Sequence, residues 1–181
     1  MKIEEHALIK NSLGINSRCK LLVTIESLED LPKLKSHINA SEDYYIVGEG
    51  TNIVMPNYFD GIIIKANFNH IIEDAENNIL KVGAAFNWNN LVKHCVSKGI
   101  YGFENLIDIP GSVGASPIQN IGAYGSDVSE VIDSIDCFCL ETFQFKTLSN
   151  SDCKFTYRDS ALKGSKFLIH NINFKIGRAH V

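Results

Sequence analysis

The chain has 181 residues, of which 45% are apolar, enough for one ordinary core or for two small cores that share an interface. A formal net charge of −4 and the lack of a run of Lys or Arg argue against nucleic acid as a partner. No stretch of about 18 apolar residues occurs, and the N-terminal MKIEEHALIKNSLG has no long apolar segment, so neither a membrane span nor a signal peptide is predicted. We therefore expect a cytoplasmic protein.

The five cysteines have no paired spacing, which is typical of reduced thiols in a reducing compartment. Cys137 and Cys139 would share one face of a strand, but two thiols without a nearby Cys or His make a poor zinc site. We predict no metal site. The thiols are interpreted as small buried hydrophobic groups, namely Cys19, Cys95, Cys137, Cys139 and Cys153.

The first third of the chain predicts strand, helix and strand. Leu21–Ile25 is a short apolar run suited to a buried strand, and from Ser27 onward leucines recur at helical spacing. Pro32 requires that this helix start late or that its first turn be bent. Tyr44–Val47 predicts the next strand. Two further short strands are expected at Ile53–Met55 and Gly61–Lys65.

The remainder predicts a second group of strands with one clear helix. Ile79–Val82 reads as a strand, and apolar residues from Trp88 to Val96 follow helical spacing, with Gly99 as the expected stop. Between Glu104 and Gly125 the apolar residues follow neither helical nor strand spacing. Beyond that stretch we expect a hairpin, a short helix and a last strand, at Ile135–Leu140 with Gln144–Leu148, at Ser149 with Asp152, and at Phe167–Ile176.

These elements predict an α+β chain of two small lobes, 1–66 and 67–175. The last strand should lead into a turn, but the chain stops shortly after it. We interpret 176–181 as a non-native tail that lies outside the fold, and we expect the natural gene to continue.

The first candidate site is formed by Gly48, Glu49, Gly50, Thr51 and Asn52, directly after an expected strand. A glycine-rich turn can expose several N–H groups in one concavity, which suits the oxygens of a pyrophosphate. Glycine also lets the backbone approach a ligand closely. An ordinary tight turn would have the same composition, and no third glycine opens a helix as in the dinucleotide fingerprint.

The second candidate site is the stretch 109–125, which has four glycines and two prolines and cannot form regular structure. A long irregular stretch inside a compact domain is usually functional. We expect a branched side chain at Gly114 to occupy ligand space without disturbing the fold. Small residues should clear room for a planar ring and donate N–H bonds to its polar edge, namely Gly111, Ser112, Gly114, Ala115 and Ser116.

The third candidate site is Tyr157-Arg158-Asp159-Ser160. An Arg next to an Asp usually forms a surface ion pair. The planar, permanently charged guanidinium of Arg158 would also suit a carboxylate. The residues alone leave both interpretations open.

Together and in this order, the three motifs resemble those of the UDP-N-acetylenolpyruvoylglucosamine reductases, also called UDP-N-acetylmuramate dehydrogenases. The resemblance runs from about Asn11 to Lys175 and includes the NSLG of 11–14 and the GFENL of 102–106. The SPIQNIGAYG of 116–125 is similar to the branch of the family that has an extra substrate-closing loop later in the chain.

The resemblance implies the two-lobed FAD-binding fold of the vanillyl-alcohol-oxidase (PCMH) type, with non-covalent FAD between two α+β lobes. Gly48–Asn52 would hold the pyrophosphate. The remaining cofactor-binding residues would line the pyrophosphate and the isoalloxazine, namely Pro110, Gly111, Ser112, Gly114, Ala115, Ser116, Ile118, Gly122 and Gly125.

The resemblance also implies a reaction in peptidoglycan precursor synthesis. NADPH would reduce FAD, and hydride would then pass to the enolpyruvyl double bond of a UDP-sugar. Arg158 would stabilise the enolate-like charge. The family's proton-donating Ser and its second Glu lie in a later domain and have no counterpart here, so we expect the chain to bind FAD without turnover.

Three alternatives stay open. An FAD-dependent oxidase of the same fold often tethers its cofactor through a His or Cys in the first glycine-rich loop, and Gly48–Asn52 has neither. A non-catalytic flavin-binding module would need no further domain. A plain nucleotide-binding α+β domain without a redox role would differ in that no yellow colour copurifies with it. The sequence does not predict the oligomeric state.

Overall fold

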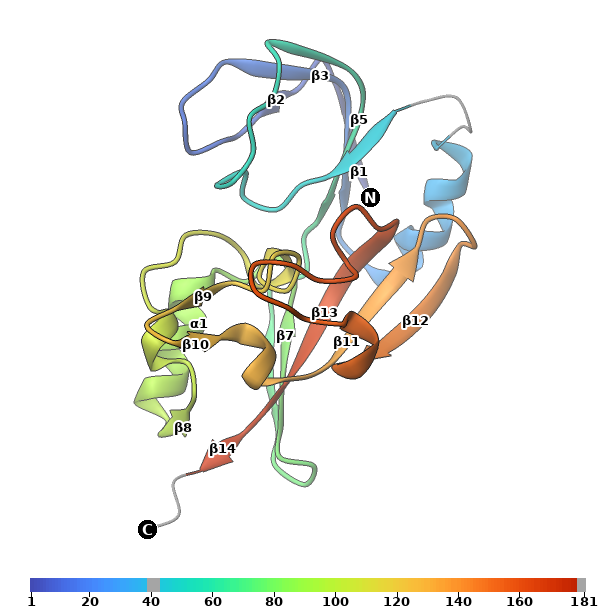
Figure 1. Cartoon of the computed structure of the whole chain (residues 1–181). Helices are drawn as coiled ribbons and strands as arrows, with labels where there is room; N and C mark the ends of the chain where they lie inside the picture. The colour runs from blue at the N-terminus through green and yellow to red at the C-terminus, as the bar shows by residue number, and fades with distance from the viewer. Residues whose placement is uncertain (39–42, 179–181) are drawn as a thin grey trace.

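The computed structural model describes residues 1–38 and 43–178. Two β-sheets of different topology divide these residues near Ala66, and the sheets lie one above the other with the single α-helix beside the second sheet (Figure 1). No helix among the described residues has both the length and the apolar character needed to cross a membrane.

The first sheet is built around two long parallel strands. Its order is β1 (Lys2–Glu5), β3 (Ser17–Ile25), β5 (Tyr58–Ala66) and β4 (Tyr44–Ile46), and β2 (Leu8–Ile9) also pairs with β3. β3 and β4 run parallel to β5, whereas β1 and β2 run antiparallel to β3.

The two faces of the first sheet have different surroundings, because successive side chains of a strand point to opposite faces. On β5, Ile62 and Ile64 face the 3₁₀ helix η1 (Leu28–Ser36) and are fully buried in the core that they form with it. Phe138 and Leu168 of the second sheet belong to the same core, so the two sheets share it. Residues 63 and 65 therefore face the opposite side.

The second sheet is entirely antiparallel. Its order is β12 (Gln144–Ser149), β11 (Ile132–Cys139), β13 (Phe167–Lys175), β7 (Ile79–Gly83) and β6 (Ile71–Asp74). The helix α1 (Trp88–Ser97) packs its buried face on this sheet, and the Trp88 indole N–H donates to the Leu106 carbonyl at 2.8 Å. That bond ties the irregular segment after α1 to the core.

Short elements connect the sheets and the irregular segment. They are β8 (Ile100–Tyr101), η2 (Glu104–Leu106), η3 (Val113–Ala115), β9 (Gly122–Ala123), β10 (Ser126–Asp127), η4 (Val128–Glu130), η5 (Ser151–Cys153) and β14 (Gly177–Arg178).

Most of the expected elements are present with small changes of boundary. The hairpin of β11 and β12 and the helix α1 are confirmed, and Gly99 follows α1 with a φ of +65°. The helix after Ser27 is 3₁₀ rather than α along its length, with Pro32 inside it. The strand expected at Ile53–Met55 is wrong, because those residues form no strand.

All five cysteines are free and buried, as expected for small hydrophobic groups. Burial raises the pKa of the Cys95 and Cys137 thiols to about 12, so these thiols are neutral at physiological pH.

The expectation that 176–181 lie outside the fold is wrong for the described part of this segment. Ile176 is buried, and its N–H donates to the Asn78 carbonyl at 2.8 Å. Gly177–Arg178 pairs with β8. Residues 179–181 lie outside the described residues, and the non-native origin of the segment stays a prediction.

Candidate functional site

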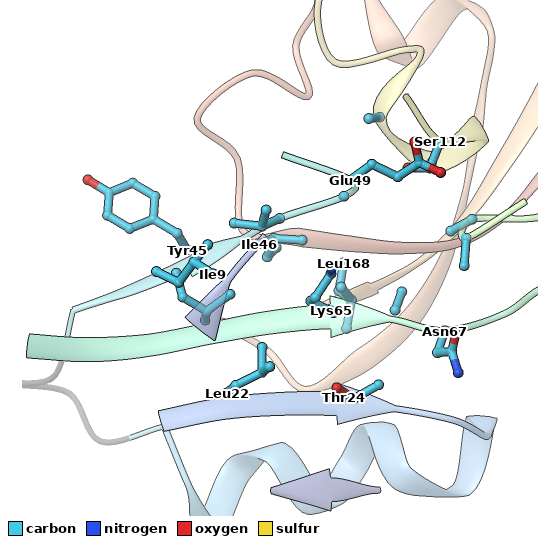
Figure 2. A pocket seen from close by; sticks show the side chains of 18 of the residues that line it. Ile9, Leu22, Thr24, Tyr45, Ile46, Glu49, Lys65, Asn67, Ser112 and Leu168 are labelled. Atoms are coloured by element: carbon cyan, nitrogen blue, oxygen red, sulfur yellow. The ribbon is translucent and has the colours of Figure 1, made fainter. Parts of the chain in front are cut away.

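A cleft of about 1050 Å³ lies between the uncovered face of the first sheet and the irregular segment of the second lobe (Figure 2). Leu22, Thr24 and Ile63 form part of its first wall, and Ala84 and Leu168 contribute to its second wall. Six residues nominated from the sequence line it, namely Gly48, Glu49, Ser112, Gly114, Ala115 and Ile118.

The first glycine-rich loop accepts hydrogen bonds through its carbonyl groups, whereas its N–H groups remain unbonded among the described residues. The Ser12 N–H donates to the Gly50 carbonyl at 3.1 Å, and the Ser12 hydroxyl donates to the Thr51 carbonyl at 3.2 Å. Gly50 has a φ of +70°, and a side chain there would collide with the Lys10 carbonyl. Within the part of the chain that the structure describes, the five N–H groups of 48–52 donate no hydrogen bond. They are free to bind an anion.

Three contacts bring the first two sequence motifs together. The Thr51 hydroxyl donates to the Pro110 carbonyl at 3.3 Å, and the Asn52 amide donates to Gln119 Oε1 at 3.2 Å. A Cβ added to Gly48 would lie 2.7 Å from Ser112 Oγ. The close approach of these segments therefore leaves little room for a side chain at position 48.

The second glycine-rich segment is bonded to the protein itself. The N–H of Val113 donates to the Phe86 carbonyl at 2.9 Å, and the N–H of Gly114 donates to the Ala84 carbonyl at 2.8 Å. The N–H groups of Ala115 and Ser116 close the turn of η3. The expectation that this run donates N–H bonds to a ligand is thus wrong for Gly114, Ala115 and Ser116, because protein carbonyls accept those bonds.

A valine at Gly114 would strike protein rather than ligand space alone. A Cβ at this position would lie 2.6 Å from the Ala84 Cβ and 3.1 Å from the Ala84 carbonyl oxygen. The expectation that a branched side chain leaves the fold undisturbed is therefore wrong.

The other nominated residues lie beside the cleft without lining it. The Ser116 hydroxyl is buried and donates to the Val113 carbonyl at 2.8 Å. Gly122 belongs to β9, and Gly125 lies in the turn that joins β9 and β10. The nominated residues outside the cleft lining are Gly50, Thr51, Asn52, Pro110, Gly111, Ser116, Gly122, Gly125 and Arg158.

Arg158 forms no ion pair with its neighbour Asp159. Its guanidinium donates to the Gly122 carbonyl at 2.6 Å, whereas Asp159 lies 3.5 Å from the Lys163 ammonium. Arg158 has a φ of +54°, which is uncommon for a residue other than glycine. The structure therefore joins the third motif to the end of the second one, at an exposed turn.

Sequence reasoning missed Lys65, which lines the cleft at the end of β5. Burial lowers the pKa of the Lys65 ammonium, Lys10 lowers it further, and Glu49 opposes both effects. A single charge at the end of the apolar run GIIIK was the available signal.

A smaller cavity of about 210 Å³ lies on the face of the second sheet that α1 does not cover. Asp136, Thr147 and His170 line it, and Asp136 accepts hydrogen bonds from Thr147 at 2.7 Å and from Asn171 at 3.1 Å. Among residues 1–38 and 43–178, no group of three His, Cys, Asp or Glu side chains is arranged to hold a metal ion.

Curated proteins with similar sequences share one name. The UDP-N-acetylenolpyruvoylglucosamine reductase of Polynucleobacter asymbioticus is 35% identical over 92% of this chain and 50% of its own length. That of Vibrio cholerae is 36% identical over 99% of this chain and 54% of its own length. The resemblance drawn from the motifs is confirmed, and the chain spans about half the length of these relatives.

Solved structures confirm the expected fold. The UDP-N-acetylenolpyruvylglucosamine reductase of Thermus caldophilus matches 99% of this chain and 64% of its own, with a TM-score of 0.83 at 21% identity. The 6-hydroxy-D-nicotine oxidase of Arthrobacter nicotinovorans matches 96% of this chain and 41% of its own, with a TM-score of 0.68 at 15% identity. At such identities the likeness concerns the α+β, two-lobed fold.

A family model described as an FAD binding domain matches residues 19–139. The match begins in β3 and ends in β11, so it includes the two glycine-rich segments and part of each wall of the cleft. Because this range is more than half of the chain, the protein belongs to the FAD-binding domain family.

Proposed function

We propose that this chain binds FAD non-covalently in the cleft between its two sheets. The observation that carries the proposal is the loop 48–52, which lines the cleft at Gly48 and Glu49 and has five consecutive N–H groups without an acceptor among residues 1–38 and 43–178. A pyrophosphate is an anion that such a set of donors can bind. The cleft also has the size of a site for a large cofactor.

The two walls would act on different parts of the cofactor. Gly48–Asn52 would hold the pyrophosphate. Ser112, Ala115 and Ile118 would leave room for the planar isoalloxazine, because the segment that carries them approaches the Ala84 backbone closely. Loop 48–52 contains no His or Cys through which the cofactor could be tethered.

We further propose that the whole protein is a UDP-N-acetylenolpyruvoylglucosamine reductase that acts in peptidoglycan precursor synthesis. FAD would supply hydride transfer between NADPH and the enolpyruvyl group of the UDP-sugar. The order of the three motifs and the curated relatives support this activity. Five free, buried cysteines fit a reducing compartment such as the cytoplasm.

Arg158 would contribute electrostatic stabilisation in that reaction. Its guanidinium keeps further N–H donors beyond the one bonded to Gly122, and its backbone is held at positive φ by the turn between Thr156 and Asp159. Unusual backbone geometry of this kind gathers at functional sites. A planar cation placed there suits the carboxylate on which negative charge develops.

A cavity-filling variant tests FAD binding by the chain itself. Ala115 lines the cleft and is exposed, so Ala115→Leu should fill ligand space without straining the core. We expect the Kd for FAD, measured by quenching of flavin fluorescence, to rise by about tenfold or more. Ala161→Leu is the matched control, because Ala161 is exposed and lies outside the cleft lining.

Both variants should melt within a few degrees of the unchanged chain. The proposal fails if the unchanged chain shows no saturable binding of FAD, or if Ala115→Leu binds FAD as tightly as Ala161→Leu. For the whole protein, NADPH oxidation that does not depend on the enolpyruvyl UDP-sugar would contradict the proposed reaction.

A further inference from the structure

Lys65 projects into the cleft from the central strands of the first sheet. It follows Ile64, which is fully buried against η1, and therefore points to the opposite face of the sheet. Figure 2 shows its side chain directed from β5 toward the side of the cleft where Glu49 and Ser112 lie. Lys65 is half-buried and belongs to the lining of the cleft.

The ammonium has no protein partner within the described residues. No carboxylate of 1–38 or 43–178 lies within ion-pair distance of Lys65 Nζ, and the ammonium donates no hydrogen bond to these residues. A half-buried cation without a partner is unfavourable, because it loses hydration and gains nothing in return. Such a group points to a ligand that provides the missing negative charge.

The surrounding charges favour an anion at this place. Lys10 lines the same cleft and lies close enough to disfavour the charged form of Lys65, so two ammonium groups share this region. The Glu49 carboxylate acts in the opposite direction and raises the pKa of Lys65. Glu49 accepts a weak hydrogen bond from the Asn87 amide at 3.4 Å, which directs part of its charge away. The net local charge is positive.

The donors of the opposite side complete the site. The unbonded N–H groups of Gly48 and Glu49 belong to residues that line the cleft on the side toward which Lys65 points. Backbone N–H groups and a lysine ammonium together are a common means of binding phosphate, with lysine acting as a point charge.

We propose that Lys65 is a phosphate-binding residue of the cleft, and that its ammonium contacts the pyrophosphate of the dinucleotide held by loop 48–52. This inference rests on the proposed binding of FAD. It assigns the anionic half of the ligand to the first sheet and leaves the flavin ring to the second wall. Lys65 thereby distinguishes phosphate-bearing ligands from riboflavin, which lacks phosphate.

The test compares three ligands with one set of variants of the 181-residue chain. Lys65→Met keeps the length of the side chain and removes the charge, and Lys65→Arg restores a cation. Binding of FAD, ADP and riboflavin is measured by flavin fluorescence and by calorimetry. In Lys65→Met we expect the Kd for FAD and for ADP to rise by about 10- to 100-fold, and the Kd for riboflavin to change by less than about twofold. Lys65→Arg should restore most of the loss.

Lys166→Met is the matched control. Lys166 lines the same cleft, but its ammonium lies over the Tyr44 ring, 4.5 Å from the centroid. The control should bind all three ligands as the unchanged chain does. Lys65→Met should melt no lower than the unchanged chain, because it removes an unpaired half-buried charge.

The other outcomes distinguish failure of this proposal from failure of the proposed function. Unchanged affinity of Lys65→Met for FAD and ADP removes Lys65 from the site. If Lys65→Met loses affinity for riboflavin as much as for FAD, Lys65 lies at the flavin ring. If Lys166→Met loses as much affinity for FAD and ADP as Lys65→Met does, the effect is one of general electrostatics. If the unchanged chain binds ADP through Lys65 but binds neither flavin, the proposed function fails while the phosphate site stands. Binding of none of the three ligands overturns both.

Discussion

The two walls of the cleft have similar compositions but use their glycines differently. In the first wall, Gly48 and Gly50 shape a loop whose N–H groups have no acceptor in the described protein. In the second wall, the N–H of Gly114 is bonded to the Ala84 carbonyl, and the missing side chain makes room for Ala84 itself. A glycine-rich run thus predicts close approach of a partner. Whether that partner is a ligand or the chain itself is decided by the hydrogen bonds.

The two walls should therefore differ in rigidity when no ligand is bound. The second wall satisfies its own backbone donors and should be rigid without a ligand. The first wall keeps donors that only water or an anion can satisfy. A bound ligand therefore stabilises the folded chain mainly through the first wall, by mass action.

The largest effect is expected from Arg158, at the edge of the second wall. In the whole protein, Arg158→Lys should slow reduction of the enolpyruvyl substrate by about 100-fold or more, because a lysine offers one point charge in place of a planar fork. Reduction of FAD by NADPH should be nearly unchanged. Stopped-flow measurement of the two half-reactions checks this.

A purely structural role of Arg158 predicts a different result. Loss of its bond to the Gly122 carbonyl would then lower the melting temperature and slow both half-reactions together. Equal slowing with lowered stability would contradict the catalytic assignment.

The next effect sharpens the difference between the walls directly. Gly114→Val should destabilise the chain by about 1–3 kcal/mol, since the added side chain collides with Ala84. Denaturant unfolding followed by circular dichroism measures this. Ala115→Val is the control, because Ala115 is exposed to the cleft and should change stability little. Equal stability of both variants would show that the second wall is looser than its hydrogen bonds indicate.

Gly48→Ala probes the first wall with a smaller change. The new methyl group would meet Ser112 Oγ at 2.7 Å and the Ala115 Cβ at 3.4 Å. The Ser112 side chain can rotate, so we expect a loss of stability below about 1 kcal/mol. The Kd for FAD should rise by about 3- to 10-fold, because the methyl group narrows the ligand space.

A double-mutant cycle separates these two effects. Ser112→Ala removes the hydroxyl that Gly48→Ala would strike, so the double variant should recover stability but not affinity. Recovery of both would mean that Gly48 serves chain packing alone, as Gly114 does.

Much of the fold could be predicted because local patterns and tertiary packing agree. The apolar spacing of Trp88, Leu91, Val92 and Cys95 fits a helix on a sheet, and the hairpin of β11 and β12 follows from alternation. The strand expected at Ile53–Met55 was wrong because three apolar residues in a row do not ensure that a neighbouring strand is available for pairing. The strand β6 was missed because it has only four residues, and its two apolar residues are adjacent and do not alternate with polar ones.

The sequence predicted which motifs form the site, but not which hydrogen bonds their residues make. The first two motifs meet through Thr51 and Asn52, and the third meets the second through Arg158, as their order suggested. No local pattern shows that Ala84 accepts the hydrogen bond of Gly114, because that contact joins residues 30 positions apart. Lys65 was missed for a related reason, since its environment is created by the second lobe.

The smallest effect is expected at His170, which lies outside the lining of the cleft, on the face of the second sheet that α1 does not cover. His170 lies beside Phe68 and Phe145, with ring centroids 5.8 and 5.9 Å away, and Asp136, Lys146 and His70 are the charged or titratable groups near it. Burial lowers the pKa of His170, Asp136 raises it and His70 lowers it. Because the folded pKa is lower than the unfolded value of about 6.5, the unfolded chain binds the proton first. Stability is therefore full above that pH and falls as the pH drops through it toward the folded pKa.

His170→Phe should reduce the loss of stability between pH 7.5 and 5, measured by denaturant unfolding, while His94→Gln on α1 should not. An unchanged pH dependence in His170→Phe would show that another group governs it.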